Sequence, residues 1–256
     1  MEKSGNSVRQ GVRLTRVYIE DTLTSGNSLE LESQTANHLI QVLRLKAGAE
    51  FIAFNGQGGQ FRCHLVETSK RRVLIKVGEY DPIDCESPLR ISLLQGLARS
   101  ERMDFGIQKA VELGASRIIP IVTERTQIRF KGEKAEKKLR HWRRIAISAC
   151  EQSGRNRIPE IGSICDLTQA MNDRAPNAIK LVLDPGANTG ISDIASKAEA
   201  NFHLLVGPEG GLSEDEIDIA QAHGFKSIQL GPRILRTESA GPALIAIIQS
   251  LWGDMG

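Results

Sequence analysis

Residues 204–216, LLVGPEGGLSEDE, contain the clearest indication of the fold class. Apolar residues lead into Gly207-Pro208, two further glycines follow, and acidic residues begin the next segment. This order predicts a buried strand, a tight glycine-rich turn and the start of a helix. Ser213 and Glu216 have the spacing of a capping box, which marks the first turn of that helix. A strand that passes through such a turn into a helix is the repeating unit of α/β proteins.

The same pattern continues on both sides of this stretch. A later strand, IQLGP at 228–232, also ends on Gly-Pro, and the helical pattern that follows it places Pro242 in its first turn. Upstream, ISLLQGLA (91–98), SERMDFGIQKAVELG (100–114) and RIIPIVTE (117–124) have the patterns of a strand, a helix and a strand. Strands that alternate with helices predict a parallel sheet covered by helices on both faces, over residues 91–256.

The first eighty residues have a different pattern. They contain short segments rich in β-forming residues, a glycine-rich turn at 55–59 and one helical piece, TANHLIQVLRL, at 35–45. Short strands joined by glycine turns predict a small β-barrel over residues 1–81. The segment 82–90 holds two prolines and few apolar residues, which is typical of a linker between domains.

Charge is distributed unevenly along the 256 residues. Residues 97–157 hold 15 Lys or Arg against seven Asp or Glu, a net charge of +8, whereas residues 158–256 have a net charge of −7. The basic segment favours a polyanion such as nucleic acid as a partner. Part of it, residues 131–144, is equally typical of a solvated helix face.

The remaining composition excludes several classes of protein. The four cysteines have no CxxC pair and no metal-ligand spacing, which argues against a disulfide framework and against a metal site. The N-terminus has no apolar signal core, and no apolar stretch has the length of a membrane span. We therefore expect a cytoplasmic protein without a metal or a membrane partner.

In an open parallel sheet, ligands bind beyond the carboxyl ends of the strands, where both Gly-Pro turns are expected. A phosphate there would face Glu209, Glu214 and Asp215, and the sequence has neither a P-loop nor a G-x-G-x-x-G fingerprint. The loop therefore favours an uncharged or cationic ligand, and S-adenosylmethionine, with a sulfonium, an ammonium and no phosphate, fits. Helix capping by these acidic residues is the structural alternative.

Several motifs together resemble one family. The C-terminal third, with LLVGPEGGLSEDEI and LGPRILRTE, is similar to the SPOUT methyltransferases, and more narrowly to the bacterial 16S ribosomal RNA uridine N3-methyltransferases (RsmE). The resemblance covers nearly the whole chain, and its other motifs are NHLIQVLR (37–44), QKAVELG (108–114), ERT (124–126) and ACEQSGRNRIPEI (149–161).

The resemblance implies a fold, an assembly and a cofactor. It implies an N-terminal PUA-like β-barrel that binds RNA, a C-terminal SPOUT domain with a deep trefoil knot, and a homodimer. The substrate it implies is a uridine in the decoding region of 16S rRNA, in the small ribosomal subunit. The residues that it implies for S-adenosylmethionine are Leu183, Gly207, Pro208, Glu209, Gly210, Gly211, Leu230, Gly231, Ile234 and Leu235.

Methylation of a uridine at N3 requires loss of the N3 proton or stabilisation of the anion. Arg236 is the candidate to stabilise that anion and Glu238 the candidate to accept the proton, whereas a surface ion pair between them is the structural alternative. The candidates to contact RNA phosphates are Arg13, His38, Arg44, Lys109, Arg125 and Arg155. A non-catalytic RNA-binding protein and a nucleotide-dependent enzyme are the competing functions.

Overall fold

The computed structural model describes residues 14–69, 72–172, 177–194 and 200–256. The chain divides into two compact units, Met1–Asp84 (unit 1) and Cys85–Gly256 (unit 2). The division falls inside the segment 82–90 that the sequence predicts to be a linker. Arg13, one of the predicted RNA contacts, lies outside the described residues.

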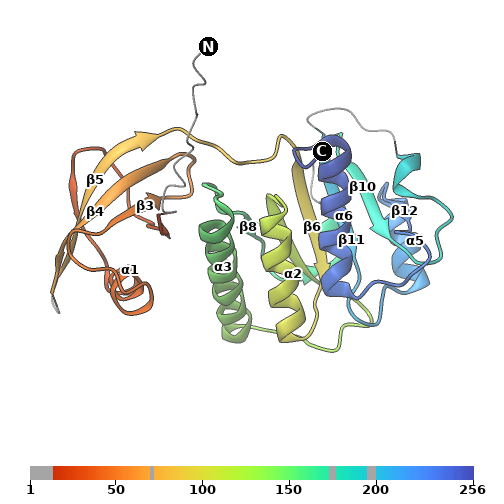
Figure 1. Ribbon diagram of the computed structural model, residues 1–256. Coiled ribbons are helices and arrows are strands. Elements are labelled where there is room, and N and C mark those ends of the chain that lie inside the picture. Colours follow the sequence, from red (N-terminus) through yellow and green to blue (C-terminus); the bar gives the residue numbers. More distant parts are fainter. Residues whose placement is uncertain (1–13, 70–71, 173–176, 195–199) are drawn as a thin grey trace, which may run out of the picture. The chain divides into compact units, whose positions relative to one another are not determined.

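Unit 1 is built on a five-stranded sheet (Figure 1). The strand order is β1-β3-β4-β5-β2, in which β1 runs parallel to β3 and the other pairs are antiparallel. Alternate residues of the long strands are buried, so each strand gives one side to the core. The strands are β1 (Arg16–Tyr18), β2 (Ser28–Glu30), β3 (Glu50–Phe54), β4 (Gln60–Thr68) and β5 (Val73–Asp81).

The helical piece of unit 1 differs from the predicted helix at 35–45. An α-helical turn, α1 (Ser33–Asn37), continues directly into a π-helical segment, η1 (His38–Val42). The helix ends before Arg44, whose φ of 55° is left-handed and cannot continue it. Ala36 and Leu39 of this piece join the core of unit 1, so packing fixes its position.

Unit 2 contains the predicted parallel sheet. Its strand order is β12-β10-β11-β6-β7-β8, with the short β9 paired to β7 off this path, and every pair is parallel. The strands are β6 (Arg90–Gly96), β7 (Arg117–Val122), β8 (Glu160–Ile161), β9 (Cys165–Asp166), β10 (Ile179–Leu183), β11 (Asn201–Val206) and β12 (Lys226–Ile228). The central strand β11 is buried from Phe202 to Val206, as expected for a parallel strand covered on both faces.

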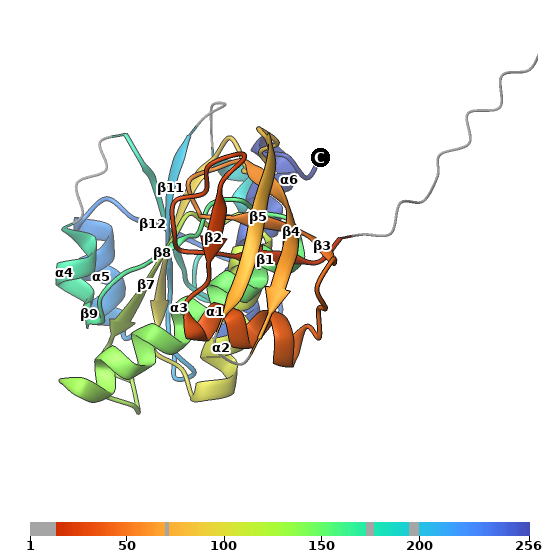
Figure 2. The same ribbon diagram turned by 90° about the vertical axis from the view of Figure 1, so that its left-hand side faces the viewer.

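Helices cover both faces of this sheet. Seen nearly edge-on, the sheet has α2, α3 and α6 on one side and α4 and α5 on the other (Figure 2). The helices are α2 (Ser100–Glu112), α3 (Glu133–Ser153), α4 (Leu167–Met171), α5 (Glu214–Ala222) and α6 (Thr237–Trp252), with a 3₁₀ turn, η2, at Ile191–Asp193. Among the described residues, no helix combines the length and the apolar character needed to cross a bilayer.

The structure corrects the predicted position of Pro242 in the last helix. The last helix, α6, begins at Thr237 and not at Pro242, so the proline lies inside the helix. It is buried there, and because it has no N–H it cannot bond the carbonyl of Glu238 four residues earlier. The first turn instead starts after Arg236, which has extended backbone angles and precedes an acidic residue that favours a helix start.

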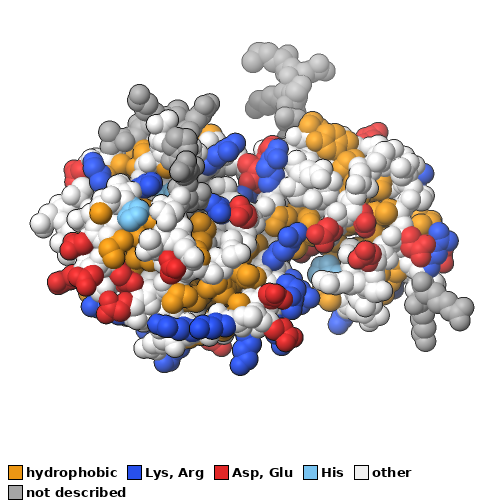
Figure 3. All heavy atoms as spheres, turned by 180° about the vertical axis from the view of Figure 1, so that it is seen from behind, with side chains coloured by type: hydrophobic (Ala, Val, Ile, Leu, Met, Phe, Trp, Pro, Cys, Tyr) orange, Lys and Arg blue, Asp and Glu red, His pale blue; other side chains and the backbone are white. Residues whose placement is uncertain are grey.

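The charges of unit 2 are separated in space as they are in sequence. Asp and Glu side chains gather on the side where α5 lies, and Lys and Arg side chains lie along the lower edge of the same face (Figure 3). Helix α5 carries three acidic residues in its first turn, and these belong to the acidic C-terminal third.

Candidate functional site

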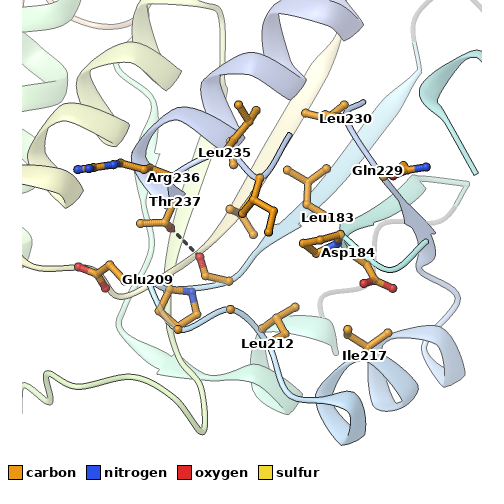
Figure 4. Close-up of a pocket in the computed structure, with 18 of the residues that line it drawn as sticks. Leu183, Asp184, Glu209, Leu212, Ile217, Gln229, Leu230, Leu235, Arg236 and Thr237 are labelled. Carbon is orange, nitrogen blue, oxygen red and sulfur yellow. Dashed lines mark hydrogen bonds between the residues drawn. The ribbon is translucent and has the colours of Figure 1, made fainter. Parts of the chain in front are cut away.

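A cavity of about 640 Å³ lies in unit 2, beyond the carboxyl ends of β10, β11 and β12 (Figure 4). Three chain segments form most of its wall, residues 183–185, 206–212 and 228–237, each of which begins where a strand ends. This is the place that an open parallel sheet offers to a ligand. All ten predicted cofactor residues line it: Leu183, Gly207, Pro208, Glu209, Gly210, Gly211, Leu230, Gly231, Ile234 and Leu235.

The glycine-rich turn packs closely against the end of β6. A Cβ atom added to Gly96 would lie 2.4 Å from the backbone N of Pro208 and 2.7 Å from the carbonyl carbon of Gly207. Both are backbone atoms, which cannot turn aside as the end of a side chain can. Glycine at 96 therefore lets the turn reach its position beside the cavity.

Thr237 fastens the start of α6 to the same turn. Its hydroxyl donates to the carbonyl oxygen of Gly207 at 2.6 Å and accepts from Nε2 of Gln95 at 2.9 Å (Figure 4). Both side chains are buried. The sequence prediction missed Thr237 as a site residue, because its partners precede it by 30 and 142 residues. The one sequence signal for Thr237 is its position between Arg236 and Glu238, the two predicted catalytic residues.

The acidic residues of the glycine-rich stretch hold neighbouring segments in place. Glu209 accepts from the backbone N–H of Arg99 at 2.9 Å, where α2 begins, and its carboxylate lies 3.4 Å from Nη1 of Arg102. Glu216 completes the capping box with Ser213 and also accepts from the backbone N–H of Glu124 at 2.8 Å. Glu209 and Glu216 therefore tie the cavity wall to the segments that follow β6 and β7.

Arg236 and Glu238 do not form the surface ion pair that was the structural alternative. Arg236 lines the cavity, is exposed, and has no side-chain partner among the described residues. The Glu238 carboxylate faces α2 instead, with Oε1 3.8 Å from Nε of Arg102. Its Oε2 is buried and has no hydrogen-bond partner in the described part of the chain. Arg102, which lines the cavity and lies beside both Glu209 and Glu238, was missed by the sequence prediction.

Comparison with known proteins identifies the family. Residues 85–249 match the model of an RNA methyltransferase domain, and residues 31–78 match that of an RNA methyltransferase PUA domain. A ribosomal RNA small subunit methyltransferase E from Buchnera aphidicola (Schizaphis graminum) is 35% identical, with 95% of this chain and 98% of that protein covered. The protein of the same name from Bacillus subtilis is 32% identical, with 91% and 92% covered. The chain belongs to the ribosomal RNA small subunit methyltransferase E family.

Solved structures agree with this membership. The methyltransferase E of Neisseria gonorrhoeae, bound to S-adenosyl methionine, has a TM-score of 0.89 and 36% identity, with 95% of this chain and 100% of that chain covered. A putative methyltransferase from Legionella pneumophila, in complex with the cofactor SAM, has a TM-score of 0.91 and 37% identity with the same coverage. The RsmE resemblance and the α/β fold with a PUA domain are thereby confirmed.

The predicted RNA contacts of this methyltransferase E family member lie in different settings. Arg125 lines the cavity, and its Nη1 donates to the carbonyl oxygens of Gly210 and Leu212, both at 3.2 Å. Lys109 is paired with Glu112 at 2.8 Å. In unit 1, Arg44 is exposed and His38 is half-buried at the start of η1. The roles of these four residues stay predictions.

The structure contradicts the prediction that Arg155 contacts RNA phosphates. Its side chain is only 4% exposed, with Nε 3.1 Å from both carboxylate oxygens of Glu86, and Nη1 donates to the carbonyl oxygens of Val111 and Ala115 at 2.8 Å. These carbonyls lie at the carboxyl end of α2, so the guanidinium joins the start of unit 2 to that helix. A guanidinium with these partners is not available to an RNA phosphate. Its prediction as an RNA contact rested on net charge, which does not reveal burial.

Proposed function

We propose that this chain transfers a methyl group from S-adenosylmethionine to N3 of a uridine in the 16S rRNA of the small ribosomal subunit. The observation that carries the proposal is the cavity at the strand ends, which brings together all ten predicted cofactor residues and Arg236. The family and the S-adenosylmethionine bound to similar structures support it. A non-catalytic RNA-binding protein would need no such cavity.

The residues around the cavity fit this cofactor. A volume of about 640 Å³ lies in the ordinary range for small-molecule sites. Apolar side chains such as Leu183, Leu230 and Ile234 line the cavity and suit a nucleobase. The side chain of Ile234 is 83% exposed, and a bound cofactor would cover part of it. Asp184 and Glu214 provide negative charge for a ligand with two cationic groups. When bound, S-adenosylmethionine supplies an electrophilic methyl group on its sulfonium.

The chain's own residues would then act on the uracil. Arg236, exposed at the cavity and unpaired, would stabilise negative charge on the uracil oxygens as the N3 proton leaves. Glu238 is not among the described residues that line the cavity, and its unpartnered carboxylate oxygen is buried, so it would accept that proton through a water. Arg102 would hold the other oxygen of the same carboxylate.

Single-turnover methylation of small ribosomal subunits tests these roles. Arg236→Lys is expected to lose most of the rate, because a point charge does not reproduce the planar fork of a guanidinium. Glu238→Gln is expected to lower turnover about 10²- to 10⁴-fold, the usual contribution of a general base. Calorimetry should show unchanged S-adenosylmethionine binding in both variants. Near-normal turnover together with a lower melting temperature would instead mark the two residues as structural.

The finer features implied by the family belong to the same proposal. We propose a PUA-like barrel over 1–81, a linker over 82–90, a SPOUT domain with a deep trefoil knot over 91–256, and a cytoplasmic location. The match of residues 31–78 to an RNA methyltransferase PUA domain and the five-stranded sheet support a PUA-like fold for unit 1.

A homodimer is the last part of this proposal. The apolar residues of α6 include Leu244, Ile248 and Leu251, of which Leu244 and Ile248 are buried within unit 2. The apolar side chains that α2 and α6 leave exposed are Phe105 (45%) and Leu251 (51%), and these are better placed to meet a partner. Light scattering is expected to give twice the chain mass of 28.1 kDa. A monomer with full activity at micromolar concentration would contradict this expectation.

A further inference from the structure

Helix α3 has its orientation fixed by contacts with α2. The buried residues of α3 are Trp142, Ala146, Ala149 and Cys150, which share one side of the helix. Nε1 of Trp142 donates to Oδ1 of Asp104 on α2 at 3.1 Å, and His141 pairs with Oδ2 of the same carboxylate at 2.9 Å. One face of α3 is therefore held against the domain, and the opposite face turns outward.

The outward face carries cations that the chain does not neutralise. Lys134, Lys137 and Arg144 are exposed, and none of them has an ion-pair or hydrogen-bond partner among the described residues. At about 100° per residue they lie within one sector, opposite the buried side, and Lys137 and Arg144 are about 10 Å apart along the axis. From Lys137 to Cys150 the helix contains five Lys or Arg and no Asp or Glu. The acidic residues of α3 near these cations are Glu133 and Glu136 in the first turn, and Glu136 pairs with Arg140 at 3.7 Å.

The first half of α3, which carries this row of cations, is in contact with the start of α2, next to the cavity wall. Lys138, on the turn between Lys134 and Arg144, donates from Nζ to the Ser100 hydroxyl at 3.0 Å. Ser100 is the first residue of α2, two residues before Arg102, which lines the cavity. A strand of RNA with one nucleotide at the cavity therefore meets α3 without leaving the surface of unit 2.

Phosphates match this row better than any other ligand chemistry. Unpaired lysines and arginines on one helix face repel one another, and a polyanion relieves that repulsion while releasing its own counterions. The basic segment as a whole has a net charge of +8, and Arg155, which is buried, does not deliver its charge to the surface. The exposed cations of α3 are among those of the segment that are free to meet a partner.

We propose that Lys134, Lys137 and Arg144 on α3 bind backbone phosphates of the rRNA next to the target uridine. The proposal rests on the proposed function in taking rRNA as the partner. It assigns to α3 the sequence-independent part of the affinity, because phosphate contacts position an RNA without reading its bases.

The test compares two double variants that remove the same charge. Lys137→Gln/Arg144→Gln removes two cations of the α3 row. Arg90→Gln/Lys226→Gln removes two exposed cations at the first residues of β6 and β12, which is the edge of the sheet away from the cavity. Affinity for small ribosomal subunits is measured by filter binding between about 50 and 300 mM salt, with S-adenosylmethionine affinity and melting temperature measured alongside.

For the α3 variant we expect the slope of log affinity against log salt to fall by about 1.4 to 1.8, which corresponds to two phosphate contacts. The control variant should keep the slope of the unchanged protein. An equal fall in both variants, or none in the α3 variant, would overturn the proposal. The measurement of S-adenosylmethionine affinity distinguishes the α3 proposal from the proposed function. If the protein without substitutions does not bind the cofactor but the two variants show the expected slopes, only the methyltransferase assignment is refuted.

Discussion

Gly96→Ala is expected to weaken S-adenosylmethionine binding about tenfold to a hundredfold. The new methyl group would lie 2.4 Å from the backbone N of Pro208, so the glycine-rich turn must move away from β6 and into the cavity wall. Overpacking of this kind typically costs 1–3 kcal/mol, and each 1.4 kcal/mol is a factor of ten in affinity. Isothermal calorimetry on the purified variant measures the loss directly.

Gly106→Ala is the matched control for this change. Gly106 is also buried, but a Cβ atom there would be 3.7 Å from its nearest neighbour, the Cα of Glu238, which is ordinary contact. Because the residue lies inside α2, alanine should even stabilise the helix by about 0.5–1 kcal/mol. If both variants bind the cofactor as tightly as the unchanged protein, the turn beside Gly96 does not shape the site.

Arg155→Met is expected to lower the free energy of unfolding by about 3–5 kcal/mol, the usual result of breaking a buried ion pair from one side. The substitution leaves the Glu86 carboxylate, 17% exposed, without the Arg155 guanidinium. It also removes a donor from two carbonyl oxygens, that of Ala115 and that of Val111, which keeps the backbone N–H of Gly114. Urea denaturation followed by circular dichroism gives the value. The affinity for rRNA, measured where the variant is still folded, should not change.

Arg140→Met provides the comparison for this second prediction. Arg140 also pairs with a glutamate, Glu136, but at 3.7 Å and with side chains that are 61% and 70% exposed. An exposed pair of this kind contributes about 0.2–1 kcal/mol, so its loss should be barely measurable. Similar stability losses in the two variants would show that the burial of Arg155 has no energetic consequence.

The sheet of unit 2 could be predicted because its signals are local. Runs such as LLVGP and IQLGP combine a buried strand with a turn in fewer than ten residues, and the position of the cavity follows from where such strands end. The cofactor residues could be predicted for the same reason, since each lies at the end of a strand or in the loop that follows it.

The contacts that hold those loops in place could not be predicted. Glu209 accepts a hydrogen bond from Arg99, 110 residues away in the sequence, and Thr237 accepts one from Gln95, 142 residues away. No sequence pattern specifies a partner over such separations. The burial of Arg155 could not be predicted for the same reason. In the sequence Arg155 is one more cation of a basic segment, and its burial is compensated by partners that the sequence does not indicate, above all Glu86, 69 residues earlier.

The order of the cavity wall along the chain also determines when the site exists. Apart from Arg102 and Arg125, every residue that lines the cavity lies at or after the last residue of β10, and the hydroxyl that binds the glycine turn belongs to Thr237. Unit 1 ends at Asp84 and has its own core, so during translation it can fold long before that wall is made. A nascent chain can therefore carry a finished first domain while it is still unable to hold a methyl donor. Competence for methyl transfer arrives only after the start of α6 has emerged from the ribosome that made it.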